Sequence, residues 1–207
     1  KEMVERQLAG RDITDKRVLA AMGRIPRHEF VPDDLRKVAY IDRPLPIGHK
    51  QTISQPYIVA LMTQLACPKP KSRALDIGTG SAYQAAVLGE LVEKVYSIEI
   101  VRPLADSARK RLAKLGYKNI EVIHGDGYRG LPKQAPFDLI IVAAAPDHVP
   151  QPLVDQLAPG GRLVIPVGKY FQNLLVIRKN ADGTIHKENV APVAFVPMTG
   201  EAQDKKD

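Results

Sequence analysis

The sequence predicts an α/β fold in which a mostly parallel β-sheet is covered by helices on both faces. Two observations support this prediction. From residue 73 onward, short apolar runs alternate with longer helical patterns, as in a doubly wound sheet. Glycine turns follow the ends of several apolar runs. The chain has 207 residues, 44% of them hydrophobic, which is enough for one domain with a full core.

The single expected domain has three parts. Residues 1–55 are expected to form short helices and an active-site loop, residues 56–179 the core, and residues 180–207 a C-terminal strand and tail. Thr14 is a candidate N-cap for a helix over residues 15–22. Prolines then break the chain into turns, and residues 48–55 are typical of a polar loop.

The core pattern predicts each strand and helix in turn. A helix is expected to begin at Pro56 and to run through Ala66, because proline suits the first helical position. The last two strands are expected to form a hairpin at the sheet edge through Asp182 and Gly183. The predicted strands are 73–77, 95–99, 121–124, 137–142, 162–167, 174–179 and 185–196, and the predicted helices are 82–91, 102–115 and 152–156.

Charge and cysteine content limit the possible functions. The net charge of +7 allows nucleic-acid binding, but the basic residues are dispersed, and the densest set along residues 102–118 is expected to be a solvated helix face. Cys67 is the only cysteine and is expected to be buried or half-buried. No metal site is expected, because the five histidines are scattered. The polar N-terminus and the lack of a long apolar run favour a cytoplasmic protein that is not bound to a membrane.

Three predicted strand ends carry groups suited to a nucleoside cofactor. Asp76 precedes the glycine turn at Gly78 and Gly80, Glu99 ends the second strand, and Asp126 follows the third. Ligands of open α/β sheets lie beyond these carboxyl ends, where an acid can accept hydrogen bonds from ribose or from an adenine amine. A carboxylate at Asp76 would repel the pyrophosphate of NAD but would attract a cationic cofactor. The pattern therefore favours S-adenosylmethionine over NAD, with helix capping by Glu99 and a simple turn at Asp126 as the plainer alternatives.

Five segments together resemble the protein-L-isoaspartate O-methyltransferase family, a family of protein-repair enzymes. The first and last of them are specific to that family, whereas the glycine-rich ones are shared with many methyltransferases. Ala82 stands where a glycine is common and Ala143 where a threonine is common. The segments are residues 51–57 (QTISQPY), 76–81 (DIGTGS), 125–128 (GDGY) with 135–138 (APFD), 157–168 (LAPGGRLVIPVG) and 195–199 (FVPMT).

The resemblance implies a Rossmann-like methyltransferase fold and a role for each matching residue. Ser54 would be the active-site hydroxyl, and Gln203 is carried over only weakly as a cofactor contact. The implied cofactor residues are Thr52, Ile53, Asp76, Gly78, Gly80, Ser81, Glu99, Ile100, Asp126, Gly127 and Thr199. The implied substrate residues are Thr52, Ser54, Phe195, Val196, Pro197 and Met198.

The implied reaction moves a methyl group from S-adenosylmethionine to the free α-carboxylate of an L-isoaspartyl residue, leaving S-adenosylhomocysteine. That carboxylate is already ionised at neutral pH, so alignment rather than a strong base would drive the step. The methyl ester would then close to a succinimide without the enzyme. Damaged proteins and peptides would be the only partners of a protein expected to be monomeric.

Two other functions remain open on the sequence. A nucleic-acid methyltransferase would suit the positive charge, but residues 142–146 (VAAAP) lack the Asn-Pro-Pro-Tyr type of motif that marks amino-group methylation. A non-enzymatic S-adenosylmethionine-binding protein on the same fold is the second alternative. The presence of Ser54, Asp76, Glu99 and Asp126 argues against it.

Overall fold

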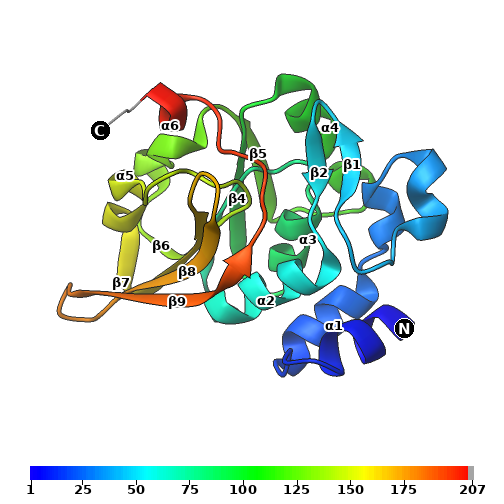
Figure 1. Ribbon diagram of the computed structural model, residues 1–207, viewed down its shortest axis with the longest axis horizontal. Helices are drawn as coiled ribbons and strands as arrows, with labels where there is room; N and C mark the ends of the chain where they lie inside the picture. Colours follow the sequence, from blue (N-terminus) through cyan, green and yellow to red (C-terminus); the bar gives the residue numbers. More distant parts are fainter. Residues whose placement is uncertain (205–207) are drawn as a thin grey trace.

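The computed structural model, which describes residues 1–204, is built on a seven-stranded sheet with the strand order β5-β4-β3-β6-β7-β8-β9 (Figure 1). The first five strands of that order run parallel, and β8 and β9 are antiparallel. The predicted α/β class and the C-terminal hairpin are therefore confirmed. The strands are β3 (Arg73–Ile77), β4 (Lys94–Glu99), β5 (Ile120–His124), β6 (Phe137–Val142), β7 (Leu157–Val167), β8 (Gln172–Lys179) and β9 (Ile185–Val193).

Alternating side chains of the central strands supply two apolar cores, one on each face of the sheet. On β6, Leu139 and Ile141 join one core, whereas Ile140 and Val142 join the other. This period of two is the geometry of a strand buried on both faces. The first core is covered by α2 (Pro56–Ala66), α3 (Tyr83–Gly89) and α4 (Arg102–Lys114), and the second by α5 (Gln151–Asp155), η4 (Gly127–Arg129) and α6 (Glu201–Asp204).

Before the core, the chain forms short helices and a small hairpin. They are η1 (Met3–Ala9), α1 (Lys16–Arg24), η2 (Arg27–Phe30), η3 (Asp33–Val38), β1 (Leu45–Gly48) and β2 (Gln51–Ile53). One more short helix, η5 (Pro132–Gln134), lies within the core just before β6. The predicted polar loop at 48–55 is wrong in part, because β2 pairs with β1 in an antiparallel ladder. The two strands form a local hairpin through His49 and Lys50, both of which have positive φ, and the polar composition of residues 48–55 does not reveal this pairing.

Other boundaries also differ from the prediction. Asp15, not Thr14, caps α1, since its side chain accepts a hydrogen bond from the Arg17 backbone N–H at 2.9 Å. Strand β7 begins at Leu157 rather than at residue 162, because Leu157 already pairs with Phe137 across an irregular register. Cys67 is exposed, contrary to the prediction; it ends α2 in the left-handed conformation (φ 51°), which turns it off the buried helix face.

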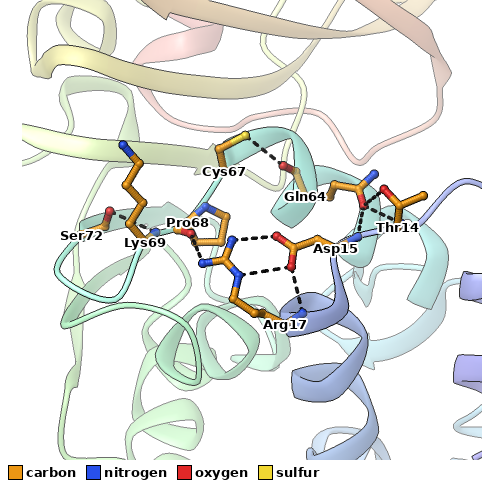
Figure 2. Close-up of polar contacts among 8 residues, drawn as sticks. All are labelled: Thr14, Asp15, Arg17, Gln64, Cys67, Pro68, Lys69 and Ser72. Carbon is orange, nitrogen blue, oxygen red and sulfur yellow. Dashed lines mark hydrogen bonds and ion pairs between the residues drawn. The ribbon is translucent and has the colours of Figure 1, made fainter.

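A single amide from α2 holds the N-terminal segment against the core (Figure 2). The Gln64 Oε1 atom accepts hydrogen bonds from the backbone N–H groups of Thr14 and Asp15, at 2.7 and 2.8 Å. Its Nε2 group donates to the Asp12 carbonyl oxygen at 3.1 Å, and Arg17 donates to the carbonyl oxygen of Pro68. The start of α1 is therefore capped partly by a side chain from another helix.

We expect Gln64→Leu to lower the free energy of unfolding by about 1–3 kcal/mol, since it leaves backbone groups of residues 12, 14 and 15 without their partners. Chemical denaturation measures the change. Gln151→Leu is the matched control, because the amide of Gln151 bonds only to Asp155 at the surface and should cost under about 0.5 kcal/mol. Equal losses in the two variants would contradict the anchoring role.

Two structural findings concern the membrane and metal expectations. Among residues 1–204, none of the helices combines the length and apolar character of a bilayer span. The same residues contain no cluster of three or more potential metal-binding side chains.

Candidate active site

A pocket opens at the carboxyl edge of the sheet, beyond the ends of β3, β4 and β6. It is bordered by the β2–α2 loop, by the glycine turn after β3 and by the C-terminal segment that follows β9. Its lining consists of Gln51, Thr52, Ile53, Ser54, Val59, Ile77, Gly78, Thr79, Gly80, Ser81, Tyr83, Gln84, Ile98, Glu99, Ile100, Val101, Gly127, Ala143, Ala144, Val196, Pro197, Met198 and Thr199. Most of the residues predicted for the site therefore meet in one place, although they come from five separate segments.

The glycine turn depends on left-handed backbone at two glycines. Gly78 and Gly80 have φ values of 89° and 51°, a region that glycine enters without steric cost. The backbone N–H groups of Gly78 and Thr79 donate to the Ile98 carbonyl oxygen, which ties the turn to β4. Ala82, which departs from the family's glycine, also has a positive φ (70°), at a position that disfavours a side chain.

Glu99 is buried and braces the two sides of the pocket floor. One carboxylate oxygen accepts from the Gly80 backbone N–H at 2.7 Å, and the other accepts from Val101 at 2.8 Å. Glu99 does not cap α4 as considered, because Val101 is the N-cap residue and the carboxylate bonds the N–H that precedes the helix. Each carboxylate oxygen can accept a further hydrogen bond, and the side chain lines the pocket, so these backbone bonds are compatible with ligand binding.

We expect Glu99→Gln to weaken S-adenosylmethionine binding at least about tenfold, because a charge-assisted hydrogen bond is worth about 1.5–3 kcal/mol. The amide also places an N–H₂ group where one backbone donor now points. Isothermal calorimetry measures the affinity. The control is Glu121→Gln. Glu121 is exposed on the edge strand β5 and pairs with Lys94 of β4, so this variant should bind the cofactor with normal affinity. Unchanged affinity of Glu99→Gln would remove this carboxylate from the cofactor site.

Asp76 is completely buried in β3, one residue before the strand ends, and lies behind the pocket rather than among its lining residues. Its Oδ2 atom accepts from the Ser97 hydroxyl at 2.7 Å, and Ser97 also contacts the Thr79 hydroxyl. Its Oδ1 atom has no hydrogen-bond partner in the described chain. Burial raises the pKa of Asp76 to about 7, with the Ser97 hydrogen bond opposing the rise and the charge of Glu99 adding to it. A buried acceptor without a partner suits a cationic ligand placed above it.

Asp126 lies outside the residues that line the pocket and holds the C-terminal segment. Its Oδ1 atom accepts from the Tyr128 backbone N–H at 2.9 Å, and its Oδ2 atom accepts from the Glu201 N–H at 2.8 Å. A Cβ atom on Gly200 would lie 2.2 Å from Oδ2, so only glycine allows this approach. Asp126 thus makes the turn considered for it and also docks the segment that brings Thr199 to the pocket.

The Thr52-Ile53-Ser54 segment lies between the pocket and a second groove. Ile53 is buried, whereas Thr52 is exposed, and the Ser54 hydroxyl makes no hydrogen bond within residues 1–204. The neighbouring groove shares four residues with the pocket, namely Thr52, Ser54, Ala143 and Val196. The rest of its lining is Pro44, Gln55, Ile58, Pro192, Val193, Ala194 and Phe195.

Several backbone groups of the C-terminal segment are paired within the described residues. The Gln172 side chain accepts from the Phe195 N–H at 2.6 Å and donates to the Phe195 carbonyl oxygen. Ala145 donates to the Val196 carbonyl oxygen and accepts from the Met198 N–H. Phe195 therefore lines the groove rather than the pocket, whereas Val196, Pro197 and Met198 line the pocket.

Several lining residues carried no clear sequence signal. Val59 lies inside a helix, and Ala143 and Ala144 carry no functional group, so composition does not single them out. Tyr83 and Gln84 follow the glycine turn directly, and that position could have identified them. Gln203, weakly predicted, is exposed and lies outside the lining residues.

Arg111 corrects the prediction of a wholly solvated basic face on α4. Its Nη1 group donates to the Ser81 carbonyl oxygen at 3.0 Å, and its Nε group donates to the Glu29 carbonyl oxygen at 2.9 Å. The guanidinium therefore joins the glycine turn to the N-terminal segment. Burial lowers the pKa of Arg111, although an arginine remains charged at neutral pH.

Comparison with known proteins finds that the chain is similar to protein-L-isoaspartate O-methyltransferases. The model of the protein-L-isoaspartate(D-aspartate) O-methyltransferase family matches residues 1–203. A Polaromonas protein-L-isoaspartate O-methyltransferase 2 is 57% identical over 194 residues, covering 93% of this chain and 92% of that protein. A Gloeobacter violaceus protein-L-isoaspartate O-methyltransferase is 51% identical over 200 residues, covering 96% and 98%.

Solved structures agree with these relatives. One described as a protein-L-isoaspartate O-methyltransferase superposes with a TM-score of 0.87 at 28% identity, covering 97% of this chain and 66% of that one. A Plasmodium falciparum structure described as the same enzyme, in complex with S-adenosyl-L-homocysteine, has a TM-score of 0.82 at 30% identity, covering 96% and 97%.

Proposed function

Because the chain belongs to the protein-L-isoaspartate(D-aspartate) O-methyltransferase family, we propose how its pocket and groove divide the reaction between cofactor and substrate. The enzyme transfers a methyl group from S-adenosylmethionine to the free α-carboxylate of L-isoaspartyl residues. The pocket takes the cofactor, and the groove takes the substrate chain. The observation that carries this assignment is their meeting at Thr52, Ser54, Ala143 and Val196.

The cofactor lies along the glycine turn in this proposal. Glu99 accepts hydrogen bonds from the ribose hydroxyls, with Ile100 beside the adenosine and Gly127 against the base. Gly127 packs so closely on Ile77 that an added Cβ atom would lie 2.3 Å from that side chain, so the position requires glycine. Asp126 contributes indirectly in this proposal. It accepts a hydrogen bond from the Glu201 N–H and so holds the C-terminal segment, which brings Thr199 to the pocket.

Asp76 serves the other end of the cofactor. Its Oδ1 atom is buried and accepts no hydrogen bond from the described residues. The carboxylate can therefore attract a positively charged group of the cofactor. The amino group of S-adenosylmethionine supplies that positive charge, directly or through one water. When bound, the cofactor supplies an electrophilic methyl carbon next to a positively charged sulfur.

The substrate carboxylate is held by Ser54. The hydroxyl has no partner within residues 1–204 and lines both cavities, so it can donate to the carboxylate oxygen. The apolar groove walls at Ile58 and Phe195 exclude water from one side of the substrate. Alignment of the ionised oxygen with the methyl carbon, at a reacting distance of about 3 Å, then provides most of the rate acceleration.

A methyl-transfer assay with labelled S-adenosylmethionine tests the assignment. We expect an L-isoaspartyl peptide to be methylated and the matched L-aspartyl peptide and duplex DNA to remain unlabelled. The isoaspartyl residue places its α-carboxylate on a side branch and lengthens the main chain by one methylene, a displacement that the groove can distinguish. Equal labelling of both peptides would reject the repair reaction, and labelling of DNA would favour a nucleic-acid methyltransferase.

A further inference from the structure

A fully buried arginine lies behind the loop that carries Ser54. Arg27 begins η2 and has a relative exposure of 0%. Its Nη2 group donates to the Ser54 carbonyl oxygen at 2.7 Å, and its Nε group donates to the Ala39 carbonyl oxygen at 2.8 Å. The guanidinium also lies 4.6 Å from the ring centre of Tyr83, which lines the cofactor pocket. One side chain therefore touches the active-site loop, the N-terminal segment and α3.

This arginine has no anionic partner in the described chain. No carboxylate of residues 1–204 forms an ion pair with it, and the nearby Asp42 pairs with Arg11 and accepts from the Tyr57 N–H. The Nη1 group is buried and has no hydrogen-bond partner there. Burial lowers the pKa of Arg27, but the side chain stays charged, because an arginine does not deprotonate in proteins.

A buried charge without an ion-pair partner is costly, and the Tyr83 ring and the charge of Asp42, which forms no ion pair with it, offset only part of that cost. The two carbonyl contacts by themselves could be made by a neutral amide, so they do not account for the charge. The negative group missing from the chain is of the kind that the substrate supplies, since the methyl-accepting carboxylate is ionised at neutral pH. Low local dielectric would make this attraction stronger than at the surface.

Building on the proposed function, we propose that Arg27 is a positioning residue whose buried positive charge selects an ionised carboxylate at Ser54. It holds the Ser54 backbone from behind and does not touch the substrate. The selectivity concerns the charge of the acceptor group, whereas the groove distinguishes the isoaspartyl from the aspartyl main chain.

The test compares binding of two peptides to the enzyme saturated with S-adenosylhomocysteine. One carries the isoaspartyl α-carboxylate, and the other carries the neutral α-carboxamide in its place. We expect the wild-type enzyme to prefer the carboxylate by about tenfold or more, Arg27→Lys to keep most of the preference, and Arg27→Gln to bring it below about threefold. A merely structural role would weaken both peptides alike and leave their ratio unchanged.

Two further variants make the outcome decisive. Arg27→Met fills the space with apolar atoms and serves as a second neutral variant, so whichever neutral variant folds by circular dichroism decides. Arg162→Gln is the matched control, because Arg162 also donates to a backbone carbonyl oxygen, that of Leu65, away from the pocket. An unchanged preference in a folded neutral variant would overturn the role of Arg27. Failure of the wild-type enzyme to methylate the isoaspartyl peptide would instead reject the proposed function.

Discussion

Ser54→Ala is expected to lower the turnover rate on an L-isoaspartyl peptide by about 10²-fold, the scale seen when one aligned hydrogen-bond donor is lost. Ser54 lines both the pocket and the groove, and its hydroxyl makes no hydrogen bond within residues 1–204, so removal of the hydroxyl should change stability little. The melting temperature and the affinity for S-adenosylmethionine should therefore change little. Steady-state kinetics with saturating cofactor measures the loss.

The control for this variant is Thr184→Ala, which removes an exposed hydroxyl from the turn between β8 and β9 and should turn over normally. The Ser54 hydroxyl makes no hydrogen bond within residues 1–204 that would support its loop, so a stability loss near about 1 kcal/mol, the net value of one hydrogen bond, would also contradict this assignment. Near-normal turnover by the folded variant would exclude the hydroxyl from the reaction. The alignment role would then pass to the backbone of residues 52–54, which Arg27 supports through the Ser54 carbonyl.

Asp76→Asn is expected to stabilise the ligand-free protein at alkaline pH by up to about 4 kcal/mol. The pKa of Asp76 is raised from 3.8 to about 7, roughly three units, and one unit corresponds to about 1.4 kcal/mol. A raised folded-state pKa contributes stability that is fully present below pH 3.8 and is lost as the pH rises through 7. The wild-type protein therefore loses stability between pH 4 and 7, and the neutral amide does not.

Denaturation of both proteins at pH 5 and at pH 8.5 measures this difference. The gain from Asp76→Asn should be largest at pH 8.5 and smaller at pH 5, where the folded-state carboxyl is protonated, and it should vanish only below pH 3.8, where Asp76 is protonated in both states. Asp33→Asn, at a side chain that is 92% exposed, should show no such pH dependence. A gain of equal size at both pH values would mean that packing, not charge, sets the effect.

The same variant should bind S-adenosylmethionine less tightly, because the amide no longer attracts the cofactor's amino group. Greater stability together with weaker binding would indicate that the carboxylate is retained for the ligand at a cost to the fold. Improved stability with unchanged affinity would leave Asp76 as a structural residue bonded to Ser97.

Local sequence pattern was sufficient to predict the fold class and the order of the core elements. The limits of β6 were predicted to the residue, as was the start of α2 at Pro56. These features follow from local causes: the period of apolar residues, the fixed φ of proline and the freedom of glycine in tight turns. The strand-end acids were also found in this way, since the carboxyl ends of parallel strands share one edge.

The family likeness of residues 51–57 pointed to Ser54, but only the folded structure showed that this residue lines two neighbouring cavities. The pairing of β2 with β1 and the exposure of Cys67 likewise escaped local reasoning. Asp126 and Glu201 are 75 positions apart, and no periodicity reports that one docks the other.

Arg27 illustrates the same limit most clearly. In the sequence it is one of 30 basic residues, and the average arginine is solvated. Its burial results from the simultaneous packing of η2, η3, the β2–α2 loop and α3, whose contacts are set by long-range geometry. Local pattern thus decides which elements form and where the sheet presents its edge. The burial of a charged side chain, and the presence or absence of a partner for it, depend instead on how segments that are distant in the sequence pack together.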